Sequence, residues 1–151
     1  YQVSLVDKEN VVSTMLNRDI RYQVKRTSSV SGETETLEIT NLSDFDTYGH
    51  LGDVSAYKEA IEAFDVEIPM ILNTLNNDDL LIITADHGND PIHHGTDHTR
   101  EYVPLVIYHN NVKGGILPIG KTFANVGATI ADNFDVEAPK IGTSLLDRIV
   151  K

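Results

Sequence analysis

A chain of 151 residues is about the size of one domain, so its length argues against two independent hydrophobic cores. Its 23 acidic residues outnumber its 12 lysines and arginines, and the resulting formal charge of −11 argues against nucleic-acid binding through charge. Because the chain contains no cysteine, a disulfide framework and a thiolate zinc site are both excluded.

The sequence carries no recognisable targeting or membrane segment. Its longest apolar runs, at residues 80–83 and 103–108, are far too short to span a bilayer. No basic stretch followed by an apolar one opens the chain, so we expect no secretory signal, no membrane association and a cytoplasmic protein. The first residue is Tyr1 and not Met, which favours a processed, truncated or excised piece.

The first 36 residues give mixed local signals and form a separate N-terminal segment in our prediction. Residues 3–6 have the composition of a strand, and residues 11–16 have that of a short helix. Residues 27–34 are polar and rich in turn formers. The pattern is clearer over residues 37–151, which we take as the second part of the chain.

A strand, a loop and a helix are predicted next. Apolar and polar residues alternate over 37–42, as in a strand, and residues 43–52 follow as a loop. Over residues 57–75 apolar side chains recur at intervals of three, four and seven, which places them on one face of a helix. Asp53 is a candidate N-cap of this helix, and Pro69 predicts a kink or a break in it.

Two continuous apolar runs, at residues 80–85 and 103–108, are typical of strands that are buried on both faces in a parallel sheet. A polar loop lies between them, and helices are predicted for residues 123–133 and 144–150. The succession of strands and helices indicates an α/β fold.

The loop after the first of these strands concentrates residue types that bind metals. Residues 86–101 have the sequence DHGNDPIHHGTDHTRE, which contains four of the six histidines in the chain, interleaved with aspartates. Ligands bind at the carboxyl ends of strands in an open α/β sheet, and carboxylate with imidazole suits Zn, Mn or Fe. Gly88 permits the turn that would let the adjacent Asp86 and His87 reach one site.

A second cluster, DFDTYGH at residues 44–50, follows the strand predicted at residues 37–42. Two neighbouring strand ends would aim Asp and His side chains into one crevice, where two metal ions could clamp a transferring phosphoryl group. Divalent ions would also offset the acidic surface, which otherwise repels a phosphorylated sugar.

Structural explanations compete with this metal hypothesis. An isolated Asp-His-Gly is more often a loop with a helix cap, and His93 and His94 suit a solvated loop. Asp44 and Asp90 suit caps of turns or helices. Two clusters that each follow a strand favour the metal site, but spacing alone does not decide the question.

The residues of both clusters resemble motifs of bacterial phosphopentomutases. Residues 80–91 (LLIITADHGNDP) and 95–104 (GTDHTREYVP) are similar to the family's C-terminal signature, and residues 41–50 are similar to its preceding metal motif. Independent phosphoglycerate mutases share the Asp-His-Gly turn but diverge after it. The resemblance, which begins at about residue 37, implies an alkaline-phosphatase-like core with a mostly parallel sheet flanked by helices, incomplete in this chain.

The resemblance also implies a chemistry. Phosphopentomutases interconvert ribose or deoxyribose 1- and 5-phosphates through a phosphorylated threonine, and they typically use two manganese ions. Carried over by position, Asp86 and His87 would hold one metal. Asp46, His50 and His98 would hold the other. The implied substrate is a pentose phosphate.

The chain departs from the family in several places. The nucleophilic threonine, the first metal-binding aspartate and the substrate-capping domain have no counterpart here, so no catalytic residue is assigned. The spacing between Asp46 and His50 is one residue short, which leaves Asp44 as a competing ligand. Leu51 and Gly52 stand where the family usually has two arginines.

Three functional hypotheses remain open: a fragment of a phosphopentomutase, another enzyme of the alkaline phosphatase superfamily, and a degenerate copy that binds metal or a partner protein without catalysis. The first predicts activity only when a missing N-terminal half is supplied. The first and the third both predict an exposed apolar face, which that half or self-association would cover.

Overall fold

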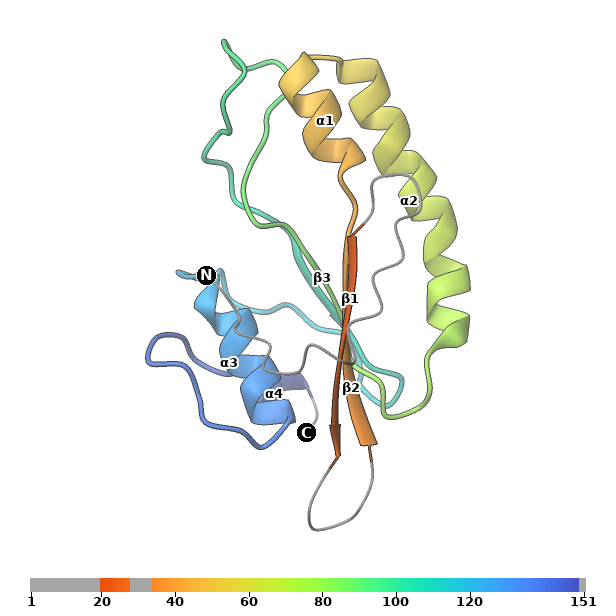
Figure 1. The fold of residues 1–151 in the computed structure, drawn as a ribbon, viewed down its shortest axis with the longest axis vertical. Helices are drawn as coiled ribbons and strands as arrows, with labels where there is room; N and C mark the ends of the chain where they lie inside the picture. The colour runs from red at the N-terminus through yellow and green to blue at the C-terminus, as the bar shows by residue number, and fades with distance from the viewer. Residues whose placement is uncertain (1–19, 28–33, 150–151) are drawn as a thin grey trace.

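The computed structural model describes residues 20–27 and 34–149, and Figure 1 shows their arrangement. The elements are, in chain order, β1 (Ile20–Thr27), β2 (Thr34–Asn41), α1 (Asp44–Leu51), α2 (Val54–Thr74), β3 (Leu81–Thr84), β4 (Leu105–Tyr108), α3 (Ala124–Asn133) and α4 (Leu146–Ile149). The strands run through the middle of the molecule, with α1 and α2 on one side and α3 and α4 on the other (Figure 1). The fold is therefore mixed α/β.

The described strands pair antiparallel, in two separate two-stranded sheets. β1 pairs with β2, and β3 pairs with β4, where Leu81 lies opposite Tyr108 and Thr84 lies opposite Leu105. The mostly parallel sheet that the resemblance implied is therefore not seen among these strands. A parallel pair needs a crossover, usually a helix, and residues 85–104 between β3 and β4 contain none, so the chain returns antiparallel.

Several predictions for the N-terminal part fall on residues that the structure does not describe. These are the strand at residues 3–6, the helix at residues 11–16 and the turn-forming residues 28–33. β1 lies within the first 36 residues and was not predicted. The strand predicted at residues 37–42 is present as β2, which begins earlier, at Thr34.

The prediction of a loop at residues 43–52 is wrong, because this segment forms the helix α1. Asp44 and Asp46 lie in its first turn, where negative charge interacts favourably with the helix dipole. Gly52 closes the helix in the left-handed conformation, with φ of 65°, and donates its N–H back into the last turn. Because the segment is helical, Asp46 and His50 lie one turn apart on the same face of α1.

The predicted start of α2 is confirmed. The Asp53 carboxylate accepts a hydrogen bond of 3.0 Å from the N–H of Ala56, as an N-cap does. The break predicted at Pro69 is absent, because α2 continues beyond this residue to Thr74. A proline removes one backbone hydrogen bond of a helix, and the turns on either side retain their own hydrogen bonds. The helices predicted at residues 123–133 and 144–150 are present as α3 and a shorter α4.

The buried core of the described residues is small. It consists of Ala128, Thr129 and Ala131 on α3 with Ile149 on α4, and Gly49 of α1 is also buried. β3 is only partly buried, and not buried on both faces as predicted, because the helices pack in pairs, α1 with α2 and α3 with α4. Large apolar side chains are exposed, among them Leu51, Val66, Met70, Ile92, Tyr102 and Ile116.

Within residues 20–27 and 34–149, no helix combines the length and the apolar character needed to cross a membrane.

Candidate metal centre

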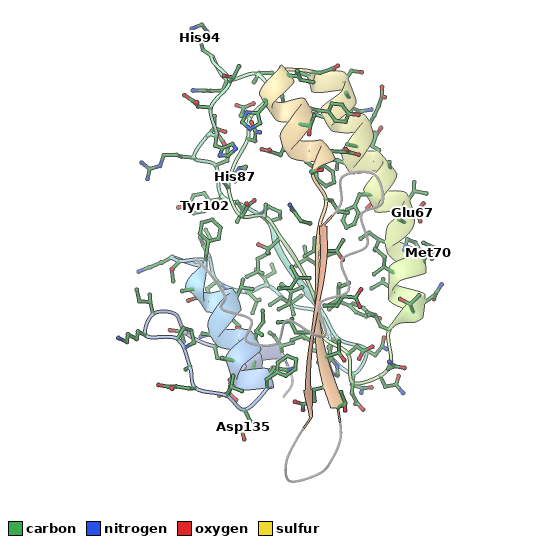
Figure 2. All side chains as sticks on the ribbon, in the orientation of Figure 1. Glu67, Met70, His87, His94, Tyr102 and Asp135 are labelled. Atoms are coloured by element: carbon green, nitrogen blue, oxygen red, sulfur yellow. The ribbon has the colours of Figure 1, made fainter. Side chains whose placement is uncertain are left out.

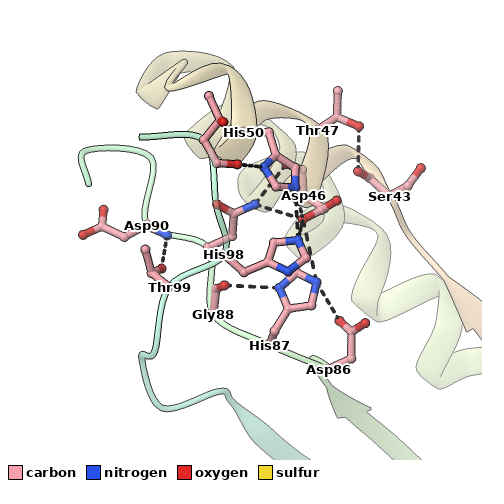
Figure 3. A network of polar contacts seen from close by, with 12 residues as sticks. Ser43, Asp46, Thr47, His50, Asp86, His87, Gly88, Asp90, His98 and Thr99 are labelled. Carbon is pink, nitrogen blue, oxygen red and sulfur yellow. Dashed lines mark hydrogen bonds and ion pairs between the residues drawn. The ribbon is translucent and has the colours of Figure 1, made fainter. Parts of the chain in front are cut away.

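Three segments that are separated in the sequence meet at the carboxyl end of β3 (Figure 3). α1 contributes Asp46 and His50, which lie one turn apart and therefore on the same face of the helix. The turn that follows β3 contributes His87, and the loop that leads to β4 contributes His98. An isolated β-bridge next to both of these histidines brings the two ends of the loop together.

One carboxylate oxygen lies at the centre of this group. Asp46 Oδ1 is 3.3 Å from His50 Nε2 and 3.3 Å from His98 Nε2. Its distance to His87 Nε2 is 3.8 Å. His50 Nε2 and His98 Nε2 are themselves 3.0 Å apart. Three ring nitrogens from three segments therefore converge on a single oxygen.

Backbone carbonyls set the tautomers of two of these histidines. His50 Nδ1 bonds the carbonyl oxygen of Thr96, and His87 Nδ1 lies 3.1 Å from the carbonyl oxygen of Gly88. A carbonyl oxygen only accepts, so each Nδ1 carries the proton and donates it. In the neutral rings the Nε2 atoms then present lone pairs to the Asp46 carboxylate. Metal sites in proteins orient ligating imidazoles by the same kind of bond.

The converging atoms fit a metal ion. A proton shared between two of the ring nitrogens would form one hydrogen bond. The remaining Nε2 lone pair would still face the negatively charged oxygen of Asp46. A divalent cation attracts the three nitrogens and the oxygen alike. Ligand atoms held about 2.0–2.2 Å from one ion lie about 3.0–3.5 Å from one another. The observed separations of 3.0, 3.3 and 3.8 Å are close to that range. Asp46, His87 and His98 each offer a ligand atom within 4.8 Å of the other two.

A comparison with protein families points to the same chemistry. A model of the Metalloenzyme superfamily matches residues 3–138 of the chain. The chain belongs to the metalloenzyme superfamily. This superfamily is alkaline-phosphatase-like, and membership points to metal-dependent phosphoryl transfer. The matched range contains all five predicted ligands, and it begins well before residue 37, where the resemblance in motifs starts.

Two further aspartates of this superfamily member differ in their placement. Asp86 Oδ1 lies 3.6 Å from His87 Nε2, but the side chain of Asp86 is 87% exposed, and it stands at the rim of the group. His87 therefore lies near both Asp86 and the central Asp46. Asp44 precedes Asp46 by two residues on α1, which turns it to a different side of the helix. The central position belongs to Asp46.

The other polar residues of the loop have local roles. His93 and His94 are exposed, and Figure 2 shows His94 at the outer edge of the molecule, well away from His87. Asp90 Oδ1 accepts a hydrogen bond of 3.0 Å from the N–H of Ile92 and so caps a turn. These residues match the structural explanations that the sequence offered for them.

Two threonine hydroxyls near the site are occupied. Thr47 Oγ1 donates to the carbonyl oxygen of Ser43 at 3.0 Å (Figure 3). Thr99 Oγ1 donates to the Glu101 carboxylate and accepts a hydrogen bond of 2.7 Å from the N–H of Asp90. Both hydroxyls take part in local hydrogen bonds, and the resemblance assigns the nucleophile to neither.

Two contributors to the site were not predicted. Asn89 Nδ2 lies 2.9 Å from Asp46 Oδ1 and 3.1 Å from the Asp46 carbonyl oxygen. Asn89 directly follows Asp-His-Gly in the sequence, and its place in that motif is the signal that could have found it. Thr96 acts through its backbone carbonyl, which no pattern of side chains reveals.

Proposed function

We propose that this chain supplies the C-terminal metal-binding part of a phosphopentomutase-like enzyme, which interconverts ribose or deoxyribose 1-phosphate and 5-phosphate. The observation that carries the proposal is the convergence of three imidazole Nε2 atoms on Asp46 Oδ1. Superfamily membership supports metal-dependent phosphoryl transfer. The choice of a pentose phosphate rests on the resemblance of residues 95–104 to the phosphopentomutase signature.

The proposed metal is divalent, and the resemblance favours manganese. Asp46, His87 and His98 would hold it, since their ligand atoms lie within 4.8 Å of one another. His50 would join them, because its Nε2 lies 3.3 Å from Asp46 Oδ1 and 3.0 Å from His98 Nε2. When bound, such an ion supplies positive charge that stabilises a transferring phosphoryl group. The resemblance implies a second ion at Asp86 and His87. His87 Nε2 lies 3.6 Å from Asp86 Oδ1 and 3.8 Å from Asp46 Oδ1, so we propose that His87 stands between the two ions and that an aspartate from the rest of the enzyme completes the second site.

The metal-binding side chains are partly exposed to solvent. The side chains of Asp46 and His98 are 44% and 47% exposed. The chain's formal charge of −11 would repel a phosphate dianion from this face unless bound cations offset it locally. We therefore expect substrate binding to depend on the metal.

The chain is proposed to act together with an N-terminal half of the enzyme. The resemblance places the nucleophilic threonine in an N-terminal part of the enzyme, and no threonine of this chain is assigned that role. Without this threonine, no phosphorylated enzyme intermediate forms. Apolar side chains on α2, including Val66 and Met70, are exposed, as they would be if another part of the enzyme covered them. Figure 2 shows Met70 on the outer side of α2. Self-association is the competing way to cover this surface.

A degenerate copy that binds metal without catalysis is the second candidate. The spacing between Asp46 and His50, one residue shorter than in the family, favoured this candidate, because a shortened loop was expected to hold the two ligands apart. On α1 this spacing is one helical turn, and it brings Asp46 Oδ1 within 3.3 Å of His50 Nε2. The spacing is therefore compatible with a working site. Leu51 and Gly52, in place of two arginines, still favour the degenerate copy.

Isomerisation of ribose 1-phosphate, followed by phosphorus NMR, tests the proposed function. With manganese and the complementary N-terminal part of a phosphopentomutase, the chain should produce ribose 5-phosphate, whereas the His98→Ala variant should not. The chain alone should produce none, because it lacks the nucleophile. A metal-loaded complex that leaves ribose 1-phosphate unchanged would overturn the assignment. Conversion of 3-phosphoglycerate in its place would favour another enzyme of the superfamily.

A further inference from the structure

The side chain of Asn89 connects the two segments that carry the converging ligands. It follows β3, and its Nδ2 donates to both the Oδ1 and the backbone oxygen of Asp46 on α1, at 2.9 and 3.1 Å. Because a backbone carbonyl oxygen only accepts, the atom that faces it must be the amide nitrogen, which settles the orientation of the amide. Both of these hydrogen bonds thus go to one residue, Asp46.

Gly49 explains how Asn89 can approach α1 so closely. Gly49 is the buried residue of that helix and lies three residues after Asp46, on the same face. A Cβ atom at this position would lie 2.5 Å from Asn89 Cγ and 2.6 Å from Asn89 Nδ2, which is closer than real side chains come. The absence of a side chain at Gly49 therefore leaves the space that the amide occupies.

We propose that Asn89 is a positioning residue, which together with Gly49 sets the place and the rotamer of Asp46 so that Oδ1 faces the three imidazoles. The inference rests on the proposed metal-binding function and deepens it, since Asn89 would act on the metal only through Asp46. Hydrogen bonds from outside the ligand set hold a ligating carboxylate in place, and their loss weakens metal binding about 10–100-fold. Asn89 and Gly49 thus form one unit that joins α1 to the turn after β3.

Titration of the chain with cobalt(II), followed by visible absorption, tests this proposal. We expect Asn89→Ala and Gly49→Ala each to weaken cobalt binding about 10–100-fold. The absorption bands at saturating cobalt should also shift, because the Asp46 oxygen is no longer held. A purely structural role would lower the folded fraction but leave the bands of the bound form unchanged, and that result would overturn the proposal.

Asn111→Ala is the matched control. Asn111 Nδ2 also donates to a backbone carbonyl, that of Asn77, at 3.3 Å. It lies beyond the Leu81–Tyr108 pair of the β3–β4 sheet, whereas the metal site lies beyond the opposite end. The affinity and the absorption bands of this variant should equal those of the wild type.

A double variant tests whether the two residues act as one unit. If Gly49→Ala works by displacing the amide of Asn89, then adding it to Asn89→Ala should cost little further affinity. Losses that add in full would overturn the proposed link. Equal cobalt affinity in the wild type and in both single variants would overturn the inference alone. A wild-type chain that binds no cobalt would overturn the proposed function and the inference with it.

Discussion

The imidazole rings of His87 and His98 stack face to face, with centroids 3.5 Å apart and planes inclined by 17°. The stack joins a residue at the end of β3 to one on the returning loop, and both rings present Nε2 to Asp46 Oδ1. Neutral imidazoles can stack in this way, whereas two imidazolium ions at this distance would repel each other. The stack therefore suits neutral rings that share one cation.

The hydrogen bonds at Nδ1 predict the tautomers of His50 and His87. In the zinc-loaded chain both rings should carry their proton on Nδ1, because each donates to a backbone carbonyl oxygen. Long-range nitrogen–proton correlation NMR distinguishes the two tautomers of each ring. A proton on Nε2 of either ring in the presence of zinc would contradict the predicted ligand set.

Thr129 holds the C-terminal segment against α3. It is fully buried, and its hydroxyl donates to the carbonyl of Asn125 at 2.7 Å and accepts from the N–H of Leu145 at 2.9 Å. Thr129→Val should lower the free energy of unfolding by about 1–3 kcal/mol, because the N–H of Leu145 loses its acceptor. Urea denaturation followed by circular dichroism measures the change. Thr74→Val, which removes an exposed hydroxyl, is the control, and a loss of equal size there would show that burial is not the cause.

The apolar surface of α2 predicts that the isolated chain binds hydrophobic dyes. Val66 and Met70 lie one turn apart and are 74% and 61% exposed. Replacing both with Ser should reduce the fluorescence of a bound anilinonaphthalene dye and leave cobalt binding unchanged, while Glu67→Ser, at an adjacent exposed polar position, should alter neither. The complementary N-terminal half should displace the dye. If it binds the chain and the dye signal persists, this surface is not the one that it covers.

The sequence allowed a correct prediction wherever a local pattern controls the structure. The cap at Asp53 needs only one side chain and the first turn of a helix, and the apolar runs of β3 and β4 are visible in the sequence. α1 was missed because residues 43–52 carry glycines and no sustained apolar stripe. Its contacts lie outside the segment: Phe45 meets Phe64 of α2, and Asn89 fills the space beside Gly49.

The site was predictable in its residue types but not in its geometry. The five candidate ligands are visible as two clusters, yet the choice between Asp44 and Asp46 depends on the phase of α1, which the predicted loop concealed. The antiparallel direction of β3 and β4, by contrast, was predictable, because the polar loop expected between the two apolar runs leaves no helix that could cross over to a parallel neighbour. The tautomers of His50 and His87 depend on backbone carbonyls, which are present at every residue and carry no sequence signal.

Metal content is the most direct test of the central claim, which is that Asp46, His50, His87 and His98 form a metal site. The purified chain would be incubated with manganese, dialysed and analysed by mass spectrometry beside its variants. We predict one retained ion for the wild type, none for Asp46→Ala and His98→Ala, and one for His94→Ala, whose exposed side chain lies outside the group. No retained ion in the wild type, or an ion retained equally by every variant, would contradict the claim.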